Sequence, residues 1–124
     1  MPTLFLYGTS LPGQPDNRWI MGLNTAPATV RGSLWRGQRH RPVLVPDPAG
    51  KPIHGLLVDV DFERLCVMDL VETAGDGPLR RERVSAAHNM RGVPAEAWVF
   101  PMGTRPPRGW RKLATEDWAR IAAR

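Results

Sequence analysis

The sequence predicts a single α+β domain that is rich in short strands. Its 124 residues match the usual size of one domain and are enough to bury a hydrophobic core. Thirteen prolines and twelve glycines, about a fifth of the chain, favour short elements joined by turns over a helical bundle. No repeat, low-complexity segment or linker interrupts this pattern. Residues 1–124 therefore form one predicted domain.

The chain opens with a predicted strand that runs into a small-residue loop. Residues 3–7 are rich in aliphatic and aromatic side chains, which is typical of a short buried strand. The loop that follows, residues 8–13, has glycine at both ends. A short helix is predicted over residues 16–23, with Asp16 as its N-cap.

Three more strands are predicted before the middle of the chain. The alternation of apolar and polar residues indicates strands over 28–35, 41–46 and 53–60. A turn rich in proline and glycine, residues 47–52, separates the last two. Gly55 lies inside the third of these strands, where a glycine indicates a bulge or a close approach of another backbone.

The hydrophobic period then changes from that of a strand to that of a helix. A three-residue spacing predicts a helix over 61–72, capped by Asp61 and ended near Gly75, with an apolar side of Leu65, Met68 and Val71. Cys66 falls in this apolar stretch, so we expect it to be a small buried core residue rather than a reactive thiol. As the single cysteine, it excludes an internal disulfide and a multi-cysteine metal site.

Two strands and a second helix are predicted in the last third. Residues 79–87 and 93–100 resemble two strands joined by the polar turn 88–92. A proline-rich stretch, 101–109, leads to a C-terminal helix that Thr115 caps, with an apolar side of Trp118, Ile121 and Ala122.

Charge and hydropathy bear on the partners. The N-terminus shows no secretory signal, and no apolar stretch approaches the ~20 residues that cross a bilayer, so we expect a cytoplasmic protein without a membrane partner. The net charge of +5 is spread over three regions rather than one stripe, which favours a solvated basic surface. Nucleic-acid binding through the basic tail stays a weaker alternative.

The loop after the first strand is a candidate anion site. Gly8 permits a backbone with positive φ and a close approach of a ligand to the main chain. Successive amide N–H groups in such a loop can point to one spot and hold a carboxylate. A tight turn without a ligand explains the same residues, and the loop matches neither a phosphate-binding P-loop nor a dinucleotide fingerprint.

Glu72 is the candidate acid/base residue. It lies three positions after Asp69, so both carboxylates can share one side of the predicted helix near its C-terminus. The negative end of the helix dipole and burial both raise the pKa of a glutamate, which suits proton transfer near neutral pH. A solvated glutamate at a helix end is the alternative.

Together these segments resemble the gamma-glutamylcyclotransferase-like superfamily. Residues 6–11, Leu-Tyr-Gly-Thr-Ser-Leu, are similar to its N-terminal Tyr-Gly-[Ser/Thr]-x-Leu motif, and residues 68–72, Met-Asp-Leu-Val-Glu, are similar to its Leu-Asp-x-x-Glu segment. The resemblance runs from residue 3 to residue 100. It implies a small mixed β-barrel with flanking helices. The length and the first motif look most like the avirulence-induced-gene-like and gamma-glutamylamine cyclotransferase branch.

The resemblance also implies an activity and a set of roles. A small gamma-glutamyl amine or peptide would cyclise to 5-oxoproline and release a free amine, with no metal or organic cofactor. Glu72 would be the general acid/base. Backbone N–H groups of Gly8, Thr9, Ser10 and Leu11 would hold the substrate's α-carboxylate, and Tyr7 would close the wall or donate a hydrogen bond.

Two positions depart from the pattern that the resemblance implies. Leu79 stands where relatives often carry tyrosine, and Thr73 stands where glycine is common after the catalytic glutamate. The lost aromatic hydroxyl bears first on substrate identity. It also motivates a second hypothesis, a non-catalytic module of the same fold that binds a carboxylate-bearing metabolite.

Overall fold

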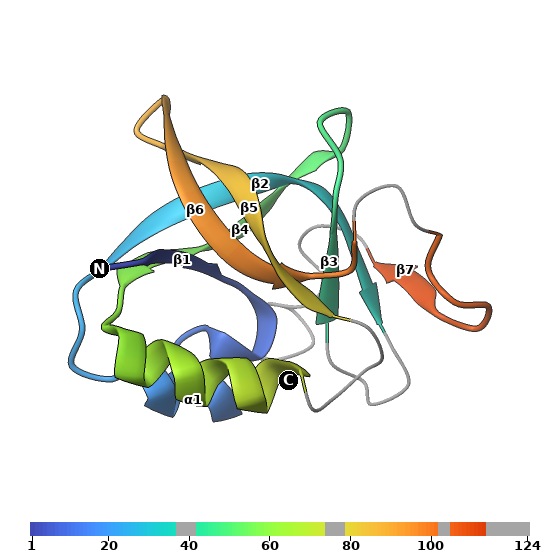
Figure 1. The fold of residues 1–124 in the computed structure, drawn as a ribbon. Helices are drawn as coiled ribbons and strands as arrows, with labels where there is room; N and C mark the ends of the chain where they lie inside the picture. The colour runs from blue at the N-terminus through green and yellow to red at the C-terminus, as the bar shows by residue number, and fades with distance from the viewer. Residues whose placement is uncertain (37–41, 74–78, 102–104, 114–124) are drawn as a thin grey trace.

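The structure, a computed structural model, describes residues 1–36, 42–73, 79–101 and 105–113. Figure 1 shows a strongly curved sheet with one long helix, α1 (Phe62–Thr73), lying across the lower end of its strands. Two short 3-10 helices follow the first strand, η1 (Gly8–Ser10) and η2 (Pro15–Ile20). The strands are β1 (Thr3–Leu6), β2 (Thr25–Arg36), β3 (Pro42–Pro46), β4 (Lys51–Asp59), β5 (Arg80–His88), β6 (Arg91–Val99) and β7 (Arg111–Leu113).

Five of these strands close into a mixed barrel. The order β2-β4-β1-β6-β5 returns to β2 through the pair Thr29 and Ala87. β1 runs parallel to β6 and antiparallel to β4, and the remaining barrel pairs are antiparallel. β3 and β7 pair with the far end of β2, outside this ring. The predicted α+β class and the barrel that the resemblance implies are both confirmed.

The strand β1 is buried on both faces, which explains its continuous apolar run. Phe5 points into the core enclosed by the barrel, whereas Leu4 and Leu6 belong to a second core between the barrel wall, α1 and η2. A strand covered on both faces loses the usual polar alternation. Gly55 on β4 permits the close approach that was predicted: a Cβ there would lie 2.3 Å from the Leu6 carbonyl oxygen.

The helix α1 begins and packs largely as predicted. The N–H of Arg64 donates to Asp61 Oδ1 at 2.7 Å, which is the expected N-cap hydrogen bond. Leu65, Met68 and Glu72 are its buried residues. The prediction for Cys66 was wrong, because its side chain is exposed. One residue turns a helix by about 100°, so the neighbour of a central core residue such as Leu65 points away from the barrel.

Other boundaries differ where local chemistry favours a tighter element. The helix expected over 16–23 is the 3-10 helix Pro15–Ile20, and Gln14 rather than Asp16 is its N-cap. Proline suits the first helical position, so the element starts one residue earlier. The turn predicted over 88–92 is a two-residue hairpin turn, Asn89-Met90, with φ of 48° and 64°.

The predicted strands agree with the structure, whereas one predicted helix end and the predicted C-terminal helix cannot be compared with it. The strands expected over 28–35, 41–46, 53–60, 79–87 and 93–100 are all present, with no end shifted by more than three residues. β7 was not predicted, since its three residues follow a proline-rich stretch and carry little pattern of their own. The expected helix end near Gly75 and the C-terminal helix capped by Thr115 lie outside the described residues.

Candidate active site

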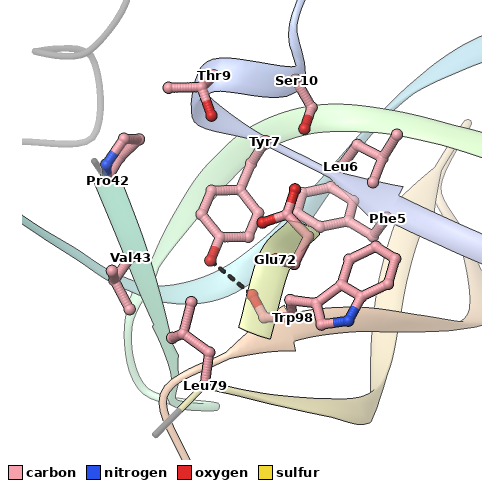
Figure 2. A pocket seen from close by; sticks show the side chains of 10 residues that line it. All are labelled: Phe5, Leu6, Tyr7, Thr9, Ser10, Pro42, Val43, Glu72, Leu79 and Trp98. Atoms are coloured by element: carbon pink, nitrogen blue, oxygen red, sulfur yellow. Dashed lines mark hydrogen bonds between the residues drawn. The ribbon is translucent and has the colours of Figure 1, made fainter. Parts of the chain in front are cut away.

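A narrow pocket lies where the loop after β1 meets the C-terminal turn of α1 (Figure 2). It draws its wall from β1, η1, β3, α1 and β6, which are far apart in sequence. Its lining residues are Phe5, Leu6, Tyr7, Thr9, Ser10, Pro42, Val43, Glu72, Leu79 and Trp98. The enclosed space is about 20 Å³, room for about one water-sized group. The pocket is partly open, so a larger ligand can extend beyond this space.

The loop after β1 folds into the 3-10 turn η1. Gly8 adopts a φ of +63°, and the turn is closed by the N–H of Ser10 to the Tyr7 carbonyl (3.3 Å) and the N–H of Leu11 to the Gly8 carbonyl (3.1 Å). Thr9 and Ser10 line the pocket, and their hydroxyl oxygens point into it in Figure 2. Gly8 and Leu11, which were also predicted to bind substrate, do not line it.

Asn17 fixes this turn from behind. Its Nδ2 donates to the carbonyl oxygen of Ser10 at 3.0 Å. Ser10 itself is 5% exposed, so its side chain is held in a defined place inside the protein. The turn is thus a preformed wall of the pocket.

Glu72 lies opposite this turn. It is 8% exposed, one of two buried polar or charged side chains among the described residues, and the other is Ser10. In Figure 2 the carboxylate points toward Thr9 and Ser10 rather than into the helix axis or away from the barrel. A buried carboxylate is rare unless it has partners or a task. The spatial relation predicted from two segments about sixty residues apart is therefore present in the structure.

Tyr7 closes the wall between two strands. Its hydroxyl donates to the carbonyl oxygen of Trp98 at 2.7 Å and accepts the N–H of Leu44 at 2.9 Å. The first of these bonds is drawn in Figure 2. Its ring also stacks on Phe5, with centroids 6.2 Å apart. Tyr7 thus forms part of the pocket wall and donates a hydrogen bond within the fold. Its role toward a substrate stays a prediction.

Replacement of Tyr7 by phenylalanine is expected to destabilise the fold. It removes the hydroxyl that the Leu44 N–H and the Trp98 carbonyl share, and both of these hydrogen bonds are part-buried. Each buried backbone group left unsatisfied costs about 1–3 kcal/mol. We expect the free energy of unfolding to fall by about 2–4 kcal/mol, measured by urea denaturation. An unchanged urea midpoint would contradict the bracing role.

Six lining residues were not among the predicted site residues: Phe5, Leu6, Pro42, Val43, Leu79 and Trp98. Phe5 and Leu6 belong to β1, which leads into the loop. Pro42 and Val43 come from β3, whose place beside η1 depends on tertiary pairing. Leu79 was noted only as a departure from the resemblance, and Trp98 only as an apolar residue of a strand. Tertiary pairing of distant segments, which no local pattern encodes, brings the last four of these residues to the pocket.

The structure bears on other partners in two ways. In the described segments, no three histidine, cysteine, aspartate or glutamate side chains gather as a metal site would require. The ring nitrogen Nδ1 of His88 instead lies 2.6 Å from the Pro27 carbonyl oxygen. Over the same segments, no helix has both the length and the apolar character that a membrane crossing demands.

The closed five-stranded mixed barrel, with a helix across one end, defines the gamma-glutamylcyclotransferase-like fold. Residues 4–120 match the model of the family described as gamma-glutamyl cyclotransferase, AIG2-like, and the chain belongs to this family. No curated protein matches the sequence. The family is thus shown by its model and by the fold.

Solved structures with the same fold come from distant organisms. An uncharacterized protein from Pyrococcus horikoshii is 20% identical with a TM-score of 0.72, and the match covers 99% of this chain and 94% of that one. An AIG2-like protein from Mus musculus is 20% identical with a TM-score of 0.68, covering 86% and 80%. A protein from Arabidopsis thaliana is 22% identical with a TM-score of 0.70, covering 98% and 83%.

Proposed function

We propose that this protein is a gamma-glutamyl cyclotransferase that converts a small gamma-glutamyl amine or peptide to 5-oxoproline and a free amine. The observation that carries the proposal is the buried carboxylate of Glu72 facing the hydroxyl-bearing turn of Thr9 and Ser10 in one pocket. Membership of the cyclotransferase family supports the same reaction class.

The reaction needs one group to move a proton and others to hold the substrate still. The substrate's α-amine attacks its own γ-carbonyl carbon, the new carbon–nitrogen bond closes the five-membered ring, and the bond to the leaving nitrogen breaks. No water is consumed. Glu72 takes the proton that the α-amine loses and returns it to the departing nitrogen, a task that typically contributes ~10²–10⁴-fold in rate.

The turn η1 supplies the grip on the α-carboxylate. The hydroxyls of Thr9 and Ser10 and the main chain of the turn are the groups on that side of the pocket. The N–H groups of Ser10 and Leu11 already donate to carbonyl groups within the turn. The two hydroxyls therefore make more of the hydrogen bonds to the α-carboxylate than they would beside a loop with free amides. Fixing the carboxylate aligns the amine with the carbonyl, which replaces much of the entropic cost of ring closure.

A direct assay tests this function. The protein is incubated with gamma-glutamyl amines, gamma-glutamyl amino acids and gamma-glutamyl peptides, and 5-oxoproline is measured by chromatography. We expect release of 5-oxoproline and free amine in equal amounts from at least one class. Absence of 5-oxoproline from every class, with folded protein, would reject the proposal.

The second candidate is a non-catalytic module that binds a carboxylate-bearing metabolite. Leu79 favours it, since this aliphatic side chain lines the pocket where relatives often provide an aromatic hydroxyl. It predicts that glutamate or 5-oxoproline raises the thermal unfolding midpoint while no gamma-glutamyl compound is consumed. Turnover in the assay above would exclude it.

A further inference from the structure

We infer that Asp69 is a positioning residue for the pocket: through the indole of Trp98 it fixes the angle at which α1 presents Glu72. The inference rests on the proposed function of Glu72. It concerns a side chain that does not line the pocket itself.

Asp69 ties the last turns of α1 to two neighbouring strands. Its Oδ1 accepts the indole N–H of Trp98 on β6 at 2.7 Å. Its Oδ2 forms an ion pair with Arg81 on β5, whose Nε also donates to Glu96 Oε2 at 3.0 Å. The carboxylate of Asp69 is thus held from two directions, three residues before Glu72.

Trp98 joins this contact to the opposite wall of the pocket. It is 3% exposed and lines the pocket. Its carbonyl oxygen accepts the hydroxyl of Tyr7 at 2.7 Å, while its indole N–H donates to Asp69. One residue therefore links the strand that leads into η1 with the helix that carries Glu72. Trp98 thus connects the two halves of the proposed site by hydrogen bonds.

The end of a helix is where such a connection matters most. The last carbonyl groups of a helix have no partner inside it, and helix ends fray. In α1 the Thr73 hydroxyl donates to the Asp69 carbonyl at 2.6 Å, so Asp69 is bound through both its side chain and its main chain. Rotation of α1 about its axis would carry the Glu72 carboxyl along an arc, and a displacement of about 1 Å can cost ~10²-fold in rate.

Geometry rather than charge is the important property of Asp69. The side chains of Asp69 and Arg81 are 36% and 29% exposed, so their ion pair is partly solvated and contributes little by itself. The hydrogen bond to Trp98 fixes direction, and an amide oxygen can accept it as a carboxylate does. This separates two substitutions: Asp69→Asn keeps an acceptor for the indole, and Asp69→Ala removes it.

The first test compares these variants by steady-state kinetics on the substrate that the wild type cleaves. We expect Asp69→Ala to lower kcat by about 10–100-fold with little change in KM, because only the placement of Glu72 is lost. Asp69→Asn restores most of the rate. Glu96→Gln is the matched control, since it removes the other carboxylate on Arg81 without touching α1, and its kcat stays at the wild-type value. Equal loss in Asp69→Asn and Asp69→Ala, or no loss in either, would overturn the inference.

A double-mutant cycle tests the route through Trp98. In a Trp98→Phe background the indole N–H is absent, so Asp69→Ala should cost much less in kcat than it does in the wild type. The same factor in both backgrounds would show that Asp69 does not act through Trp98. Thermal unfolding of each variant identifies any that fail to fold. If Asp69→Ala is among them, the kcat of Asp69→Asn is compared with those of the wild type and Glu96→Gln.

A measurement independent of turnover separates this inference from the proposed function. The ¹³C signal of the Glu72 carboxyl, assigned by its loss in Glu72→Gln, should move in Asp69→Ala and stay in place in Glu96→Gln. A moved signal in a protein that releases no 5-oxoproline would reject the proposed function and support the positioning role. The opposite result is also possible: the wild type releases 5-oxoproline, while Asp69→Ala keeps both the Glu72 signal and the kcat of the wild type. That result would reject the positioning role and leave the proposed function standing.

Discussion

Replacement of Glu72 by glutamine is expected to lower kcat for 5-oxoproline release by about 10²–10⁴-fold, the usual contribution of a general acid/base. Glutamine has nearly the same shape, so it keeps the packing of this buried position, which is 8% exposed. It cannot take the proton from the α-amine. Because the grip of η1 on the α-carboxylate is unchanged, KM should change little.

The measurement is initial-rate kinetics with chromatography of 5-oxoproline, beside a thermal melt that verifies folding. Glu63→Gln is the matched control, because Glu63 is an exposed glutamate in the first turn of the same helix. Its kcat should equal that of the wild type. Full turnover in Glu72→Gln would remove Glu72 from the mechanism. If the protein is a binding module without activity, neither variant nor the wild type releases 5-oxoproline.

Replacement of Gly8 by alanine is expected to produce the largest loss of stability. The residue has a φ of +63°, and a Cβ there would lie 2.2 Å from Cγ of Pro42. The left-handed backbone costs an L-residue about 1–2 kcal/mol, and overpacking costs a further 1–3 kcal/mol. Urea denaturation should therefore show a free energy of unfolding lower by about 2–5 kcal/mol.

Gly13 offers a matched control for this effect. Its φ is +83°, but a Cβ on Gly13 would meet nothing within 4 Å. Gly13→Ala should lower the free energy of unfolding only by the cost of a left-handed backbone at an L-residue, about 1–2 kcal/mol. Adding Pro42→Ala to Gly8→Ala removes the clashing atom and should recover much of the difference. Equal destabilisation by Gly8→Ala and Gly13→Ala would show that contact with Pro42 is not the reason for glycine at position 8.

Local patterns predicted the elements that have strong local chemistry. The cap of Asp61 and the apolar spacing of Leu65 and Met68 identified α1, because a helix is built from contacts within four residues. The strands β1 to β6 were found from their apolar residues. Cys66 shows the limit of this reasoning, since an apolar stretch does not tell which of its residues faces the core.

The candidate site was predicted in part. Tyr7, Thr9, Ser10 and Glu72 were named from the sequence with the help of a family resemblance, and the structure places all four around one pocket. The two hydrogen bonds of the Tyr7 hydroxyl and the contact of Asp69 with Trp98 were not predicted. Both depend on pairs of residues between 29 and 91 positions apart, and no spacing rule reaches that far.

By itself the sequence determined the class of fold, the glycine turn after the first strand and the acidic residue at the end of the helix. Each follows from interactions between residues that are near neighbours in the chain. Only the tertiary structure decided that β3 and β6 complete the pocket and that Trp98 connects the helix to Tyr7. Closure of the barrel, from Thr29 to Ala87, fixes the place of β6, and pairing with the far end of β2 fixes that of β3. The free energy of both comes from the whole core rather than from any one segment.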